Sequence, residues 1–260
     1  MNDPHVERLH YRIETGETVA FENPPDVSWE TPNCTITLSG GEAVVAMKTH
    51  LATEQAARAV VDPLMRGYEL HAAILGGGLP EVTLKFVRAD IVDRNPPPAG
   101  HYVLQAGTGG VLITGGTVTM LVTRRSYPQP PTRFSASPDV EILWRRYQAH
   151  RRGAESLTAM AYFSLTVVEA SVGPGGARRR AAAQYNVQFD VLDRLGYLTS
   201  EVGDEETARK WGRQAARPHT GSEKAWMNAV VLKLIRRLGE YAADPSAPME
   251  SITMKDLPGL

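Results

Sequence analysis

The chain has 260 residues, of which 42% are hydrophobic and 22% are charged, and its formal net charge is −1. These values are typical of a globular protein, and they exclude a disordered chain and a strong overall field for nucleic acid or membranes. A single cysteine, Cys34, excludes an internal disulfide framework. No apolar run approaches the roughly 20 residues of a membrane span, and no signal sequence is visible. We therefore expect a cytoplasmic protein without a membrane partner.

The first half of the chain alternates strand patterns with turn residues. Strands are predicted at residues 10–15, 18–21, 34–38, 43–49, 81–93, 101–105, 111–114 and 117–123. The turn at 39–41 joins two of these strands into a hairpin. Residues 53–75 instead repeat apolar side chains every three or four positions, at Ala56, Ala57, Val60 and Leu64, which predicts a helix capped by Thr53. Pro63 inside this helix indicates either a kink or a second helix start.

The second half is predicted to be helical throughout. Residues 126–138, SYPQPPTRFSASP, read as an extended proline-rich linker. One apolar stripe runs through 139–172 and predicts a single long helix that ends at the GPGG of 173–176. A helix is predicted next at 177–185, and after a break near Asn186 a second one ends at about Leu198. A short helix begins at Asp204, and the last helix begins at the capping box Thr220 to Glu223 and ends at about Ala243.

The fold class is therefore α+β, in three segments. Residues 1–125 form a β-rich domain, an antiparallel sheet or sandwich with one helical excursion. Residues 126–138 form the linker, and residues 139–260 form a bundle of four or five helices.

Most signatures of catalytic and metal sites are absent from the sequence. The glycine-rich segment 107–116 lacks the lysine of a phosphate-binding loop and is read as hairpin turns. Cys34 lies on an apolar strand face and His150 on an apolar helix stripe, so both are read as core residues rather than reactive groups. Asp90 and Asp93 could bind a metal as a pair, but solvated carboxylates are the favoured reading. We predict neither a metal nor a cofactor.

Clustered arginines suggest a basic face on the helical half. Its candidate nucleic-acid-binding residues are Arg145, Arg146, Arg152, Arg178, Arg179 and Arg180, with Arg151 beside them. Arginines in this arrangement could contact the phosphate backbone of RNA. The alternative reading is an ordinary solvated helix surface.

A more specific signal precedes the last helix, where Arg213 and Gln214 are followed by His219. This spacing resembles the HEPN superfamily, as do the helical pattern over residues 140–243 and the segment 177–211, which is similar to bacterial proteins that carry such a bundle. The resemblance implies a compact bundle that pairs into a homodimer, with the arginine and histidine at the protomer interface of a metal-independent ribonuclease. In that role His219 would move the proton of a ribose 2′-hydroxyl, and Arg213 would stabilise the charge on the phosphate. Neither residue is assigned a packing role, so alanine at either position is expected to leave stability within about 1 kcal/mol.

Two functions therefore remain open. The first is an RNA-binding or RNA-cleaving HEPN-like protein, of the kind found in toxin or phage-defence systems. The second is a non-enzymatic interaction or ligand-binding protein, in which the β-rich half binds a ligand and the helical bundle forms a dimer. The placement of His219 separates them, since a catalytic histidine must face a cleft.

Overall fold

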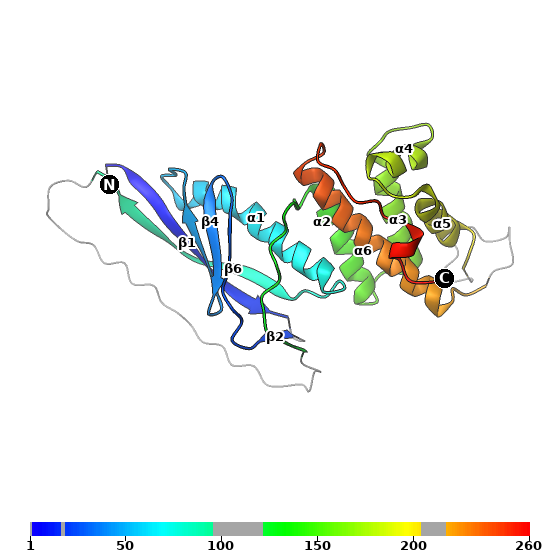
Figure 1. The fold of residues 1–260 in the computed structure, drawn as a ribbon, viewed down its shortest axis with the longest axis horizontal. Coiled ribbons are helices and arrows are strands. Elements are labelled where there is room, and N and C mark those ends of the chain that lie inside the picture. Colours follow the sequence, from blue (N-terminus) through cyan, green and yellow to red (C-terminus); the bar gives the residue numbers. More distant parts are fainter. Residues whose placement is uncertain (1, 17–18, 96–121, 204–216) are drawn as a thin grey trace. The chain divides into compact units, whose positions relative to one another are not determined.

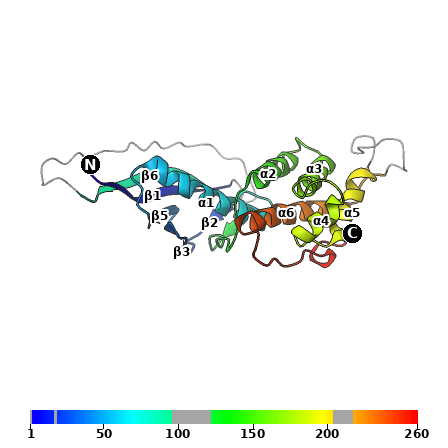
Figure 2. The same cartoon turned by 90° about the horizontal axis from the view of Figure 1, so that it is seen from above.

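The computed structural model describes residues 2–16, 19–95, 122–203 and 217–260, and it divides into two compact units. The first, the sheet unit, comprises Met1–Ala73 and Leu79–Pro130, and the second, the helical unit, comprises Ile74–Gly78 and Pro131–Leu260. The predicted α+β class is confirmed (Figures 1 and 2). Several predicted features lie outside the described residues. They are the strands at 101–105 and 111–114, most of the strand at 117–123, the glycines of 107–116 and the helix that begins at Asp204.

The sheet unit is built on a five-stranded antiparallel sheet with the order β3-β4-β5-β1-β6 (Figure 1). Its strands are β1 Pro4–Thr15, β3 Val27–Glu30, β4 Cys34–Ser39, β5 Glu42–Met47 and β6 Val82–Asp93. The predicted hairpin joins β4 to β5 and pairs Ser39 with Glu42. Its turn residues Gly40 and Gly41 have φ values of 56° and 85°, a left-handed conformation that favours glycine. A separate parallel pair joins β2 Val19–Phe21 to β7 Val122–Arg124.

Helix α1, Glu54–Leu75, covers one face of this sheet. Its buried side chains Ala57, Val61, Met65 and Tyr68 pack into one core with strand residues such as Ile36, at the spacing of three and four that a helix requires. The helical period is as predicted, but the predicted face is not the buried one, since Leu64 is exposed and Val60 only partly buried. The Thr53 hydroxyl caps the helix by accepting from the amide of Ala56 at 3.2 Å. Pro63 lies inside α1, which continues through it to Leu75.

The helical unit contains five α-helices among its described residues. They are α2 Pro138–Arg151, α3 Leu157–Ala170, α4 Ala177–Gln184, α5 Phe189–Ser200 and α6 Gly221–Ala243, followed by the short 3₁₀ helix η1, Met254–Asp256. Helix α3 packs against each of the other four, so it forms the centre of the bundle. No helix in the described part of the chain is long and apolar enough to cross a membrane.

The prediction of one continuous helix over 139–172 is wrong. The structure has two helices there, α2 and α3, separated by residues 152–156. Gly153 has a φ of 73°, which no residue inside a right-handed helix adopts, and the Ser156 hydroxyl caps the new helix by accepting from the amide of Ala159 at 3.2 Å. The apolar stripe continues across the break because both helices bury side chains in one core.

The proline-rich segment 126–138 has defined contacts at both ends. Tyr127 is buried in the sheet unit, where its hydroxyl accepts from the amide of Gly41 at 3.0 Å. At the other end, the Ser135 amide donates to the Gly239 carbonyl at 3.0 Å, and the Ser137 side chain caps α2. The division between the two units falls between these contacts, at Pro130 and Pro131.

Candidate functional site

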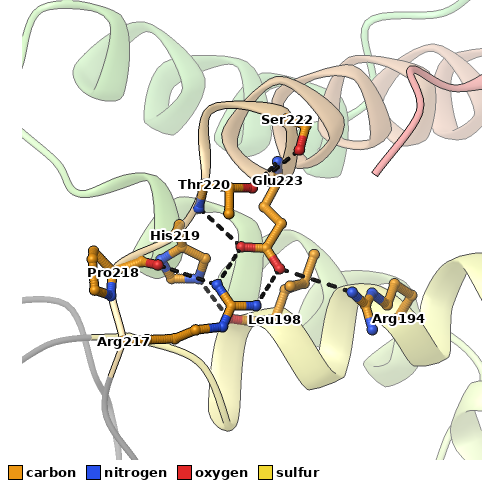
Figure 3. Close-up of polar contacts among 8 residues, drawn as sticks. All are labelled: Arg194, Leu198, Arg217, Pro218, His219, Thr220, Ser222 and Glu223. Carbon is orange, nitrogen blue, oxygen red and sulfur yellow. Dashed lines mark hydrogen bonds and ion pairs between the residues drawn. The ribbon is translucent and has the colours of Figure 1, made fainter.

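The candidate site lies at the start of α6, where the sequence places a capping box. The Thr220 hydroxyl accepts from the amide of Glu223 at 3.1 Å, and the Glu223 carboxylate accepts from the amide of Thr220 at 2.9 Å (Figure 3). The predicted capping box is therefore confirmed. Because the carboxylate of Glu223 lies at this helix terminus, the position that a phosphate would favour already holds a negative charge.

A salt bridge fixes this carboxylate. Arg217 donates to Glu223 through both terminal nitrogens, Nη1 to Oε2 at 2.8 Å and Nη2 to Oε1 at 2.6 Å (Figure 3). Arg194 of α5 approaches the same carboxylate, with Nη2 at 3.8 Å from Oε1. The hydrogen bonds from Arg217 lower the pKa of Glu223 to about 2, although burial acts in the opposite direction.

His219 is buried beside this salt bridge, with 8% of its surface exposed. Its Nε2 lies 2.9 Å from the carbonyl oxygen of Leu198 in α5 (Figure 3). Since a carbonyl oxygen only accepts, Nε2 must carry the proton and donate it. A neutral His219 then has its lone pair on Nδ1. The ring thereby joins the end of α5 to the segment that precedes α6.

The other members of the predicted catalytic group, Arg213 and Gln214, lie outside the described residues. Arg217, which lies between them and His219 in the sequence, binds Glu223 and was not among the predicted site residues. A signal for it was present, since a cation six residues before the glutamate of a capping box is within reach of its carboxylate.

Three of the six predicted nucleic-acid-binding arginines have partners within the helical unit. Arg146 donates from Nε to Glu155 at 2.8 Å. Arg178 donates to Glu169 at 2.8 Å and to Asp193 at 3.0 Å. Arg180 donates to the carbonyl of Gly173 at 2.6 Å. The carboxylates reduce the positive charge that Arg146 and Arg178 would offer a phosphate backbone.

The other three arginines, Arg145, Arg152 and Arg179, are exposed. Arg145 belongs to α2 and Arg152 follows that helix directly, whereas Arg179 belongs to α4. The guanidinium of Arg179 lies 5.5 Å from the centre of the Phe189 ring. Arg180 is exposed as well, although it donates to a carbonyl, so four of the six predicted arginines are exposed in the structure.

The remaining candidates have structural surroundings. Cys34 is fully buried, and burial raises the pKa of its thiol, which makes the reactive thiolate less accessible. Asp90 accepts from Nε2 of His10 at 2.8 Å, whereas Asp93 accepts from the amides of Asn2 and Asp3. His150 Nδ1 lies 3.1 Å from the carbonyl of Glu155. Among the described residues, no group of three or more histidine, cysteine or acidic side chains is placed to hold a metal ion.

No family model, curated protein or solved structure matches the chain. The HEPN-like character of residues 140–243 therefore stays a prediction, based on the helical pattern and on the spacing of Arg213 and His219.

Proposed function

We propose that this chain is a non-enzymatic ligand-binding protein, in which His219 is a structural residue and the sheet unit holds the ligand. The observation that carries the proposal is the hydrogen bond from Nε2 of the buried His219 to the carbonyl of Leu198. A ribonuclease histidine must reach the 2′-hydroxyl of its substrate, and this ring is shielded on most of its surface. The charge of Glu223 at the same helix terminus also disfavours an incoming phosphate.

A cavity in the sheet unit supports the ligand-binding part of the proposal. It has a volume of about 660 Å³, which is within the usual range for small-molecule sites. Ile13, Phe21 and Tyr127 line it together with the hairpin glycines Gly40 and Gly41, and none of its described lining residues is charged. The rings of Phe21 and Tyr127 lie 5.0 Å apart. The polar residues Thr15 and Asn23 also line the cavity. Such a lining favours a neutral ligand that carries an aromatic or apolar group together with hydrogen-bonding groups.

The first test is an RNA cleavage assay with the full chain and single-stranded RNAs of varied sequence, without added metal. We expect the RNA to remain intact. Cleavage that is lost in both His219→Ala and Arg213→Ala, with the variants still folded, would establish the ribonuclease and refute this proposal. Cleavage that persists in both variants would point to a contaminating nuclease, and purification would have to remove it before the test counts.

The second test addresses the cavity, with indole as a neutral aromatic probe. Chemical shifts in the NMR spectrum should change on titration of the wild type, and Phe21→Ala should weaken this response because one aromatic wall is removed. Phe189→Ala, a partly buried aromatic residue of the helical unit, is the matched control and should titrate as the wild type does. An equal response in all three proteins would place indole elsewhere and remove the assignment of the ligand to this cavity.

The proposal retains the expected homodimer of the helical unit. Light scattering at tens of micromolar should give twice the 28.4 kDa of one chain. A mass of one chain at that concentration would refute the dimer, and it would also remove the shared active site that a HEPN-like ribonuclease requires.

A further inference from the structure

A second cavity lies in the helical unit, between the C-terminal part of α6 and the segment that follows it. Its volume is about 320 Å³. Four cationic side chains line it, namely Arg133, Lys233, Arg236 and Arg237. This concentration of positive charge contrasts with the cavity of the sheet unit, and it is unexpected in a chain whose net charge is −1.

The carboxylates of this cavity do not neutralise all four cations. Glu240 serves two of them, because it accepts from Nε of Arg236 at 2.7 Å and from Nε of Arg237 at 3.1 Å. Asp256 instead accepts from the amide and the hydroxyl of Thr253, at 2.7 Å and 2.8 Å. The third carboxylate that lines the cavity is that of Glu250, which is an exposed residue.

Arg133 and Lys233 are the cations available to a ligand. Within the described part of the chain, neither forms an ion pair with a carboxylate, and Arg133 donates only to the carbonyl of Pro248 at 3.3 Å. Each has a more distant acidic neighbour: Arg133 contributes to the lowered pKa of Asp244, and Lys233 contributes to that of Asp256, after the larger effect of hydrogen bonds to these two carboxylates. Burial is the largest cause that lowers the pKa of Arg237, and Glu240 opposes it; the nearby cations Arg236 and Arg133 lower this pKa further, because they repel the guanidinium. A bound anion would relieve this repulsion.

The walls of the cavity are fixed by Arg237, which is 5% exposed. Its guanidinium donates to the carbonyl of Asn186 at 3.0 Å and to that of Glu250 at 2.6 Å, and it also donates to the carbonyl of Tyr185. The segment after α6 is held a second time, because the amide of Ile252 donates to the carbonyl of Asn186 at 3.0 Å. The site is therefore preorganised, so a ligand loses little affinity to ordering it.

We propose that this cavity binds a small molecule that carries a phosphate group, with Arg133 and Lys233 as its ligands. Arginine side chains match the geometry of phosphate oxygens, and the lysine adds a mobile point charge. The volume suits a phosphorylated metabolite of small size. The inference extends the proposed binding function to the helical unit, and it is independent of the ligand of the sheet unit.

The test is calorimetric titration of the full chain with inorganic phosphate and with glycerol 3-phosphate, at constant ionic strength. We expect saturable binding of both, about tenfold weaker in Lys233→Ala than in the wild type, because one charge-assisted contact is lost. Lys224→Ala is the matched control, since Lys224 is exposed on the same helix and does not line the cavity. It should bind as the wild type does.

Three results would overturn the inference. The first is that neither compound shows saturable binding up to tens of millimolar. The second is that the wild type and Lys233→Ala bind with equal affinity. The third is that single-stranded RNA displaces the bound compound when its concentration, counted in phosphate groups, is lower than that of the compound. The last would identify a nucleic-acid surface. Failure here would leave the proposed function standing, because that depends on RNA remaining intact and on the cavity of the sheet unit.

Discussion

The guanidinium of Arg217 donates two hydrogen bonds to the carboxylate of Glu223, a residue that is 4% exposed. Because the partner of this buried carboxylate is a cation, the charged form of Glu223 is the one that stabilises the fold. The pairing also joins the segment before α6 to the first turn of that helix. It makes the capping box sensitive to acid.

The first prediction concerns the pH dependence of this pair. The pKa of Glu223 falls from an ordinary 4.5 to about 2 in the folded protein, so the unfolded chain binds the proton more readily. The stabilisation is complete above pH 4.5 and is lost as the pH falls towards 2. At pH 7, Glu223→Gln should reduce the free energy of unfolding by about 1–3 kcal/mol.

Urea denaturation of both proteins between pH 7 and pH 2.5 measures this effect. The difference between wild type and Glu223→Gln should shrink as the pH falls. Glu201→Gln, at an exposed carboxylate of the same unit, should stay within about 0.5 kcal/mol of the wild type throughout. A difference at Glu223 that is independent of pH would show that charge is not the cause.

The second prediction revises the expectation for His219. The sequence gives this residue no packing role, but it is buried and donates to the carbonyl of Leu198. His219→Ala should therefore destabilise the protein by about 1–3 kcal/mol, because it leaves a carbonyl oxygen without its donor. His219→Gln should recover part of the loss, since its amide nitrogen is a donor of similar reach. Thermal unfolding measures both, and an unchanged midpoint for His219→Ala would contradict the structural role.

The elements of the fold were predictable where local signals and long-range packing agree. The hairpin around Gly40 and Gly41 and the α6 capping box depend on chemistry within a few residues, so the sequence reveals them. The break between α2 and α3 was missed because the apolar periodicity continues through it, whereas Gly153 and Ser156 are weak signals on their own. Periodicity records which side chains are buried, and it does not record whether the backbone between them is continuous.

The candidate site was harder to predict because its contacts join distant residues. The sequence indicates that His219 precedes a helix, but its partner is a carbonyl of Leu198, and a backbone acceptor leaves no trace in the amino-acid pattern. The same holds for Arg237, whose partners are the carbonyls of Tyr185, Asn186 and Glu250. In the sequence, Arg236 and Arg237 are simply two neighbouring arginines of an amphipathic helix.

The third prediction compares Arg237 with its neighbour Arg236, which serves as the control. Arg237→Ala should destabilise the protein by about 3 kcal/mol or more, since it leaves three carbonyls without their donor and opens a void in the core. Arg236 is exposed and bonds only to Glu240 among the described residues, so Arg236→Ala should cost no more than about 1 kcal/mol. Urea denaturation compares them, and equal losses would show that burial does not distinguish their roles.

The fourth prediction compares two adjacent glycines of the helical unit. Gly77 and Gly78 have φ values of 74° and 87°, so alanine at either position should cost about 1–2 kcal/mol in backbone strain. A Cβ on Gly77 would meet nothing within 4 Å, whereas one on Gly78 would lie 2.3 Å from Cε1 of the buried Tyr147. Gly78→Ala should therefore lose about 1–3 kcal/mol more than Gly77→Ala. Equal unfolding free energies would mean that the Tyr147 ring moves aside at little cost.

The last prediction concerns limited proteolysis of the segment 126–138. The contacts of Tyr127, Ser135 and Ser137 protect its two ends, while Gln129 and Thr132 are exposed. A protease of broad specificity should therefore cut this segment after Pro131, near Thr132, in preference to α2 or α3, because backbone without hydrogen-bonded partners enters a protease most readily. Mass spectrometry of the early fragments locates the cut. First cuts within α2 or α3, with residues 126–138 intact, would show that this segment is better protected than the helices, and the boundary between the two units would then have to be sought elsewhere.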